Sequence, residues 1–227
     1  MQPYYIPYIG YFQLIAAVDI FIIYDNVKYT KKGWINRNRI LLNGRDSVVS
    51  LPLKSGSDSF NVVQRELASN VDFDKLLNIF RGAYSRAPYF ADTILLLKEI
   101  FSYNDKNLFN FLYNSIVSVC AHLGISTEIK ISSDFAIDHG LKGADKVVEL
   151  CRYVGADVYV NPIGGVELYD YDFFRLHELD LRFLRSRPFE YSQFGEAFVP
   201  WLSIIDVLMF NPVDVVRACV TSNYELV

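Results

Sequence analysis

Residues 19–25 read Asp-Ile-Phe-Ile-Ile-Tyr-Asp. The apolar run between the two acids is typical of a strand that is buried on both faces of a parallel sheet. Open α/β folds place their binding sites at the carboxyl ends of such strands. We therefore expect a central strand over Ile20–Tyr24, with Asp25 at the edge of the sheet where a ligand binds.

The segment before this strand is a loop rich in tyrosine, since residues 2–11 read QPYYIPYIGY. Pro3, Pro7 and Gly10 exclude a regular helix or a central strand there. A short helix over Tyr11–Val18 is expected to lead from this loop into the strand.

After the strand, Asn43-Gly44 stands between two apolar stretches, which is the strongest short signal for a β-hairpin. The pattern predicts strands over 39–42 and 47–53, within an inserted hairpin of about residues 36–53. A helical segment of about residues 72–124 follows. It contains three helices, expected over 72–85, 88–101 and 105–123.

The last hundred residues alternate between the two kinds of element. Strands are expected over 127–131, 157–160 and 181–184, helices over 143–154 and 171–178, and a final helix or helix pair over 197–210 and beyond Pro212. Such alternation implies βαβ units. We predict one domain over 1–227, an α/β fold with a mostly parallel sheet, flanking helices, the inserted hairpin and the helical layer.

Composition excludes several classes of protein. Of 227 residues, 52% are hydrophobic and 15% aromatic, so the chain can bury a core and is not disordered. Its three cysteines lie far apart and form no zinc-binding pattern, so no metal site is predicted. No apolar window reaches the roughly 18 residues of a membrane span, and no signal peptide is recognisable, so we expect a cytoplasmic protein.

Charge is concentrated rather than spread. The net charge of −4 argues against a nucleic-acid-binding surface, yet residues 28–45 hold six basic residues and no acidic one. Arginine presents a rigid fork of donors to phosphates and carboxylates. Trp34, Asn36, Arg37 and Arg39 are therefore candidates for holding an anion, although a solvated loop would look similar. A second basic group comprises Arg175, Arg182, Arg185 and Arg187.

No established catalytic motif is present, and there are only three histidines, of which His139 lies in a loop and is the best placed for chemistry. The turn Asn161-Pro-Ile-Gly-Gly165 follows a predicted strand, where Gly164 and Gly165 allow either an anion to approach the backbone or a tight turn. Ser203 and Asp206 have the spacing of a capping box. Gln193 lies between aromatic residues, a pattern that suits either a surface that binds a sugar or a base, or a loop whose interior the glutamine side chain fills.

Three blocks stand in order along the chain: QPYYIPYIGYFQLI with YDNVKY and KKGWINRNRI, then GADVYVNPIGGVELYD, then FVPWLSIIDVLMFN. With these blocks, the sequence resembles the WbqC-like protein family over essentially the whole chain. The resemblance implies bacterial origin and a setting in surface-polysaccharide or O-antigen gene clusters. It carries over no catalytic residues. It also implies a few apolar residues before Gln2, so either the start lies upstream of Met1 or the sheet lacks a central strand. With that strand, the fold would resemble nucleotidylyltransferase-like folds, whose HxGH motif is absent here.

The leading hypothesis is a transferase that moves an acyl or aminoacyl group onto a nucleotide-linked amino sugar, with Asp25 as general base. The alternatives are a non-catalytic nucleotide-sugar-binding or scaffolding protein of the same pathway, and nucleotidyl transfer. The expected partner is an anionic small molecule, and the aromatic surplus would also suit a homo-oligomer. The residues expected to bind substrate are Gln2, Tyr4, Tyr11, Lys31, Lys32, Trp34, Asn36, Arg37, Arg39, Asn161, Gly164, Gly165, Tyr169 and Gln193.

Overall fold

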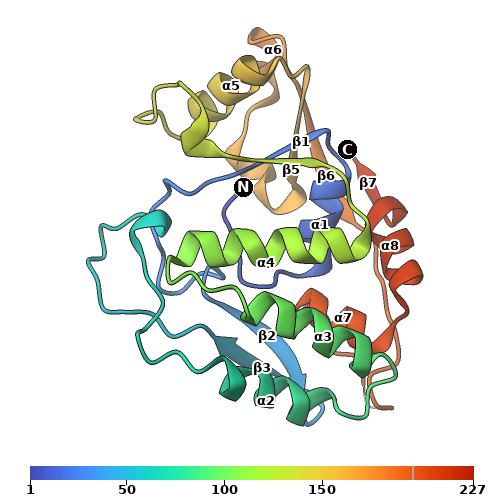
Figure 1. Ribbon diagram of the computed structural model, residues 1–227. Coiled ribbons are helices and arrows are strands. Elements are labelled where there is room, and N and C mark those ends of the chain that lie inside the picture. Colours follow the sequence, from blue (N-terminus) through green and yellow to red (C-terminus); the bar gives the residue numbers. More distant parts are fainter. Residues whose placement is uncertain (196) are drawn as a thin grey trace.

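The computed structural model describes residues 1–195 and 197–227 as a mixed α/β fold of helices and small sheets (Figure 1). The helices are α1 (Ile9–Ala16), α2 (Phe73–Tyr84), α3 (Phe90–Phe101), α4 (Leu108–Leu123), α5 (Gly143–Val154), α6 (Tyr171–Leu176), α7 (Ile204–Phe210) and α8 (Val213–Ser222). The strands are β1 (Ile20–Ile23), β2 (Arg37–Leu42), β3 (Arg45–Ser50), β4 (Glu128–Ile131), β5 (Val158–Pro162), β6 (Asp180–Ser186) and β7 (Tyr224–Leu226).

The described strands form three separate sheets rather than the single mostly parallel sheet expected. β1 pairs in parallel with β4, β2 pairs antiparallel with β3, and β6 lies between a parallel β5 and an antiparallel β7. Met1 lies against β1: its amine donates to the Ile22 carbonyl at 2.6 Å, and its carbonyl accepts from Tyr24 N–H at 2.8 Å.

Burial along β1 also differs from the expectation of a strand buried on both faces. Phe21 and Ile23 are buried, whereas Ile20 and Ile22 are half-buried. The alternation follows from the two-residue period of a strand that packs one face on the core. The parallel pairing with β4 nevertheless brings the carboxyl ends of two strands together, at Asp25 and Ser132.

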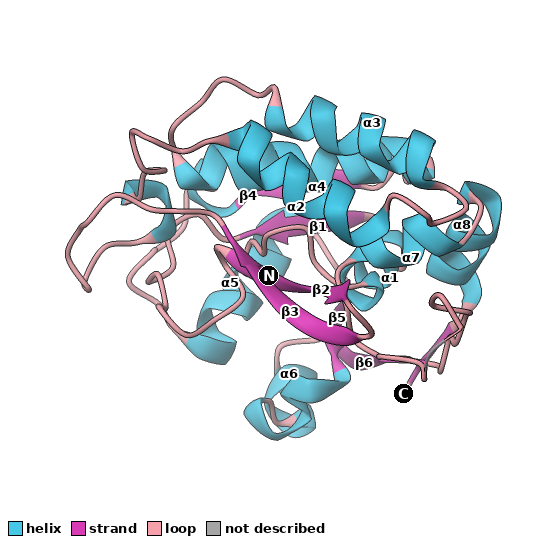
Figure 2. Cartoon of the chain, turned by 90° about the horizontal axis from the view of Figure 1, so that it is seen from below, coloured by secondary structure: helices cyan, strands magenta, loops and turns pink. Residues whose placement is uncertain are grey.

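The hairpin forms where Asn43-Gly44 predicted it. Asn43 and Gly44 have φ values of 51° and 72°, as the tight turn between paired strands requires. The pairing begins at Arg37, two residues before the expected start, and reaches Ser50 on the second strand. The hairpin lies beside α2 and α7, as the view from below shows (Figure 2).

The helical layer has the three helices predicted for residues 72–124. Asp72 caps α2 by accepting from Lys75 N–H at 2.8 Å, and Asn107 caps α4 by accepting from Asn110 N–H at 3.2 Å. Gly124, with φ 68°, ends α4 in the left-handed region. Local sequence signals therefore placed these helix ends well.

Other boundaries also differ from the sequence expectation. α1 begins at Ile9, two residues after Pro7, rather than at Tyr11. β5 extends to Pro162, so Asn161 belongs to the strand rather than to the turn after it. The helix expected from residue 197 begins only at Ile204, because Ser203 is its N-cap; residue 196 lies outside the described residues.

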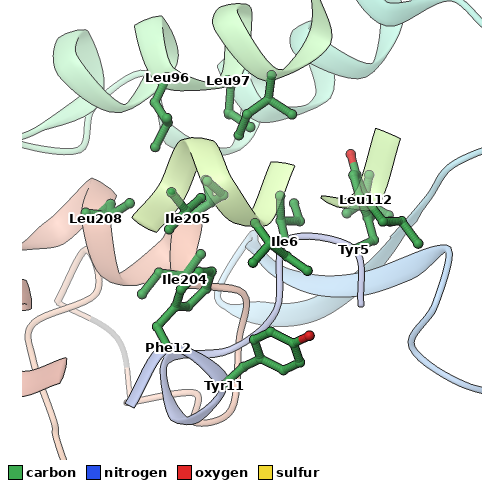
Figure 3. Close-up of a cluster of buried hydrophobic side chains, with 14 of the residues drawn as sticks. Tyr5, Ile6, Tyr11, Phe12, Leu96, Leu97, Leu112, Ile204, Ile205 and Leu208 are labelled. Atoms are coloured by element: carbon green, nitrogen blue, oxygen red, sulfur yellow. The ribbon is translucent and has the colours of Figure 1, made fainter. Parts of the chain in front are cut away.

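The main core lies between α1, the helical layer, the hairpin and α7. Figure 3 shows side chains from α1, α3, α4 and α7 meeting the N-terminal loop, where Tyr5 and Ile6 are fully buried. A second, smaller core lies under α5 and α6. Within the described ranges, no helix combines the length and the apolar character that crossing a bilayer requires.

Candidate functional site

A pocket of about 180 Å³ opens where the N-terminal loop meets the start of β2 and the loop before α7. Four aromatic side chains and one arginine dominate its wall, together with an amide and a proline. The lining residues are Tyr4, Pro7, Tyr8, Trp34, Asn38, Arg39 and Trp201. Burial raises the pKa of Tyr4 and of Tyr8, so both phenols stay neutral and can donate hydrogen bonds. The pocket therefore combines ring faces with a cation and neutral donors.

Buried polar side chains hold the pocket wall. Asn38, at the start of β2, donates through Nδ2 to the carbonyls of Tyr5 at 3.0 Å and Ile6 at 2.7 Å. Ser203, the N-cap of α7, donates to the same Ile6 carbonyl at 2.7 Å. Tyr5 N–H donates to the Trp34 carbonyl at 3.2 Å. These bonds join three segments that are distant in sequence.

Trp201 on this wall and Ile6, in the core behind it, have a strained backbone. Ile6 has φ 37° and Trp201 has φ 60°, and neither is the glycine or asparagine that tolerates the left-handed region. The surrounding hydrogen bonds overcome the strain at Ile6. Strain of this kind persists mainly at binding and catalytic sites, which favours a functional role for the pocket.

Arg39 supplies the charge of the pocket. Its guanidinium carbon lies 5.6 Å from the centre of the Trp34 ring. One terminal nitrogen contacts Asp46 Oδ2 at 3.2 Å, and the other donates to the Trp201 carbonyl at 3.2 Å. Its Nε is buried and has no hydrogen-bond partner among the described residues. An unpaired buried donor is costly, so this nitrogen adds strain to the position of the Arg39 side chain.

A second polar cluster lies at the carboxyl ends of β1 and β4, where the sequence placed Asp25. This carboxylate is 4% exposed, and its Oδ1 accepts from Ser132 Oγ at 2.8 Å and from Ser133 N–H at 3.1 Å. The next residue, Asn26, contacts Ser132, His139 and, on α5, Lys146. Asp25 does not line the pocket. The preceding residue, Tyr24, is nevertheless hydrogen-bonded to Met1, three residues before the pocket residue Tyr4.

Of the residues predicted to bind substrate, Tyr4, Trp34 and Arg39 line the pocket. Gln2 lies next to it and accepts from Tyr4 OH at 3.3 Å. The Arg37 guanidinium lies 5.9 Å from the Trp34 ring centre. The structure thus gathers this part of the predicted set around one opening.

Three other predicted residues are used within the fold. Tyr11 is 1% exposed, and its hydroxyl donates to the Gln2 carbonyl at 3.0 Å, so its ring faces the core. Asn36 accepts from Tyr29 OH at 2.8 Å and fixes the base of the hairpin. Gln193 is 1% exposed and donates to Asp206 at 2.8 Å, so its side chain fills the interior of the loop.

The lysines of the basic segment lie outside the pocket. Lys31 pairs with Asp58 at 2.6 Å, both side chains being well exposed. Lys32 is exposed, and its carbonyl accepts from the Arg37 guanidinium. The second basic group is largely neutralised by ion pairs, namely Arg175–Asp172, Arg182–Asp180 and Arg185–Glu225.

The Asn161–Gly165 turn is packed against itself. Asn161 accepts from Tyr159 OH at 3.1 Å, and the Tyr159 and Tyr169 rings meet at 5.7 Å. Gly165 is buried, and a Cβ there would collide with the Asn161 amide, whereas Gly164 is exposed. Close packing against Asn161 therefore explains why residue 165 is a glycine. Across the described residues, no group of three or more histidine, cysteine or acidic side chains is arranged to hold a metal.

The set of residues predicted to bind substrate leaves out Tyr8 and Asn38, although both lie in the segments that the sequence singled out, and it leaves out Trp201, Asn26 and Lys146. Of these, Trp201 had a usable signal, because the chain has two tryptophans and the other was already a candidate. The remaining four become recognisable only through partners that are remote in sequence.

The geometry defines a small α/β domain with an aromatic–arginine pocket, and sequence comparison gives its class. Residues 2–218 match the WbqC-like protein family, and the chain belongs to that family. A relative from Mycobacterium tuberculosis (strain ATCC 25618 / H37Rv), described as "Uncharacterized protein Rv1507c", is 32% identical over 216 residues, which cover 93% of this chain and 91% of the relative. No solved structure matches the chain.

Proposed function

We propose that the chain is a transferase of bacterial surface-polysaccharide biosynthesis, which moves an acyl or aminoacyl group onto a nucleotide-linked amino sugar. In this proposal the pocket at Trp34 and Trp201 binds the nucleotide sugar. Family membership and the chemistry of the pocket support it.

The observation that carries the proposal is the Arg39 guanidinium beside the Trp34 ring in the wall of an aromatic pocket. Tryptophan and tyrosine faces stack on the rings of bases and sugars. Arginine makes its strongest hydrogen bonds with phosphates and carboxylates. At about 180 Å³ the pocket is smaller than the roughly 300–1,000 Å³ of a site that encloses a whole drug-sized ligand. It would therefore hold one ring and leave the rest of the ligand outside.

The remainder of such a ligand could reach the polar cluster at Asp25. Tyr24 N–H donates to the Met1 carbonyl at 2.8 Å, and Tyr4, three residues after Met1, lines the pocket. Three residues span at most about 11 Å. An extended nucleotide sugar bound by its base would then direct its amino sugar toward the carboxyl ends of β1 and β4, where we place the acid–base step.

Binding can be measured directly, because both tryptophans of the chain line the pocket. UDP-N-acetylglucosamine and UDP, titrated against the protein, should quench tryptophan fluorescence in a saturable way. Arg39→Ala should weaken binding about 10- to 100-fold, since a hydrogen bond to a charged group contributes roughly 1.5–3 kcal/mol. Arg45→Ala, an exposed arginine of the same hairpin outside the pocket, is the matched control.

Assays of turnover distinguish the transferase from the non-catalytic protein and from the nucleotidyltransferase. Product that forms only when a nucleotide amino sugar and an acyl-coenzyme A or aminoacyl donor are both present supports the transferase. Saturable binding without turnover of either donor supports the non-catalytic alternative. Release of pyrophosphate from a nucleoside triphosphate supports nucleotidyl transfer. Absence of quenching by every nucleotide sugar would reject the pocket as the binding site.

A further inference from the structure

The amide of Asn26 is the centre of a directed hydrogen-bond chain. Its Oδ1 accepts from Lys146 Nζ at 3.2 Å and lies 2.9 Å from Ser132 Oγ, whose one proton it shares with Asp25 Oδ1 at 2.8 Å. Because an ammonium group only donates, the amide oxygen must face Lys146, and Nδ2 then faces His139 Nδ1 at 3.0 Å. Nδ1 of His139 therefore accepts, and its Nε2 carries the proton that bonds to the Phe135 carbonyl at 3.1 Å.

Lys146 is buried to an unusual degree for a lysine. It lies in the first turn of α5, is 8% exposed, and has its Nζ 5.3 Å from the centre of the Tyr24 ring. Among the described residues it forms no ion pair within 4.0 Å, so an amide oxygen and an aromatic face hold the ammonium. Burying a charge with so few partners is costly, and groups of this kind cluster at functional sites.

We propose that Lys146 accepts the proton of the acceptor amine in the group transfer, with Asn26 as its positioning residue and Asp25 stabilising the ammonium that forms. This inference rests on the proposed transferase function and names its base. It gives Asp25 an electrostatic role, because its negative charge acts on Lys146 while Ser132 and Ser133 hold the carboxylate through Oδ1.

In the proposed step, the amine nitrogen of the amino sugar attacks the carbonyl carbon of the activated donor. The new C–N bond forms while the bond from that carbon to the leaving group breaks, and the leaving group departs with the electron pair. One N–H proton passes to the neutral Nζ of Lys146. The lysine does not carry the acyl group itself, because an amide formed on Nζ would not transfer it onward.

The electrostatic surroundings agree with this role. Burial lowers the pKa of Lys146, and the charge of Asp25 partly opposes that shift. The other titratable groups that face it are the Tyr24 phenol, whose pKa burial raises, and His139, which acts through Asn26. A lysine with a lowered pKa has a larger neutral fraction near neutral pH, as a base requires.

Competitive labelling with trace acetic anhydride tests the inference without any substrate. The rate of acetylation of each lysine, followed against pH by mass spectrometry, gives its pKa and its accessibility. We expect Lys146 to be acetylated in the folded protein with a midpoint below those of Lys32 and Lys75, two exposed internal references. Asp25→Asn should lower the Lys146 midpoint further, and Asn26→Asp should raise it.

Two results would overturn the inference: Lys146 left unlabelled in the folded protein, which would mean that a substrate cannot reach it, or a midpoint equal to those of Lys32 and Lys75. The titration of the unsubstituted protein alone decides this, so a variant that fails to fold does not obscure the result. Because labelling needs no nucleotide sugar, its outcome is also distinct from failure of the tryptophan-quenching test.

Discussion

The hydroxyl of Tyr84, at the end of α2, donates a hydrogen bond to Oδ1 of Asp206 in α7 at 2.8 Å. The same hydroxyl accepts from the Leu41 N–H of β2 at 2.8 Å. Oδ2 of Asp206 accepts from Tyr191 OH at 2.6 Å and from Gln193 Nε2 at 2.8 Å. One fully buried carboxylate thus joins the hairpin that carries Arg39 to the helical layer and to the loop before α7.

Tyr84→Phe should destabilise the fold. The substitution leaves the Leu41 N–H without its partner and removes one donor from Asp206, and each buried group left unsatisfied costs about 1–3 kcal/mol. Urea unfolding should therefore show a lower free energy of unfolding. Tyr103→Phe, at a more exposed tyrosine, is the control and should change it little. Equal stability of the two variants would contradict the role of the Tyr84–Asp206 bond.

Stability should also depend on the protonation of Asp206. Burial raises the pKa of this carboxyl, and the hydrogen bonds from Tyr191, Tyr84 and Gln193 offset only part of the shift. Between the unfolded value of about 3.9 and the raised value, the folded chain binds more protons than the unfolded chain, so the free energy of unfolding falls as pH rises. The contribution is complete below the unfolded pKa and is lost as pH rises through the folded one.

Asp206→Asn removes this titration and should be less stable overall, because its amide NH2 faces donors. The advantage of the unsubstituted protein over Asp206→Asn should shrink as pH rises from below about 4. Urea unfolding of both proteins across a pH series measures it, and a difference that does not vary with pH would show that Asp206 does not titrate as inferred.

Local signals predicted much of the fold. Asn43-Gly44 located the hairpin, because only residues that tolerate positive φ suit that turn. The spacing of Ser203 and Asp206 correctly indicated a helix start, since Ser203 accepts from Ile205 N–H at 3.2 Å. It gave Asp206 the wrong partner: this carboxylate accepts from side chains up to 122 residues away. No local pattern contains such a pairing.

In the candidate site as well, the residues that stand close together in the sequence were predicted, whereas residues held by remote partners were not. Trp34 and Arg39 stand close together in a basic segment and were predicted from it. Asn38 and Lys146 act through carbonyl or amide groups that are 32 to 33 and 120 residues away, respectively. The prediction of a single, mostly parallel sheet was wrong for a related reason. Alternation of strands and helices predicts parallel pairs of strands, but it does not predict which pairs share a sheet.

The cysteines should be inert in the folded protein. Cys120, Cys151 and Cys219 are free and buried, and burial raises the pKa to about 12 for Cys120 and about 11 for Cys151. Because the thiolate is the reactive form, dithionitrobenzoate at neutral pH should react only as the chain opens. In guanidinium chloride all three thiols should react. A thiol that reacts quickly in the folded state would contradict this prediction.

Backbone strain at Trp201 should be separable from the contribution of its ring. The residue is 62% exposed and has φ 60°, so its side chain adds little burial while its backbone occupies a region that asparagine tolerates better than tryptophan or alanine. Trp201→Asn and Trp201→Ala both remove the ring, including its edge contact with Tyr8 at 6.1 Å between centres. They differ mainly in how well they accept positive φ.

We therefore expect Trp201→Asn to be more stable than Trp201→Ala by about 1 kcal/mol, the lower end of the strain carried by such residues. Both variants should lose affinity for UDP-N-acetylglucosamine to a similar extent, because the ring that closes the pocket is gone. Thermal unfolding measures the first effect. Calorimetric titration measures the second, since removing Trp201 alters the fluorescence signal. If the asparagine variant bound as well as the unsubstituted protein, Trp201 would serve the backbone of the loop rather than the ligand.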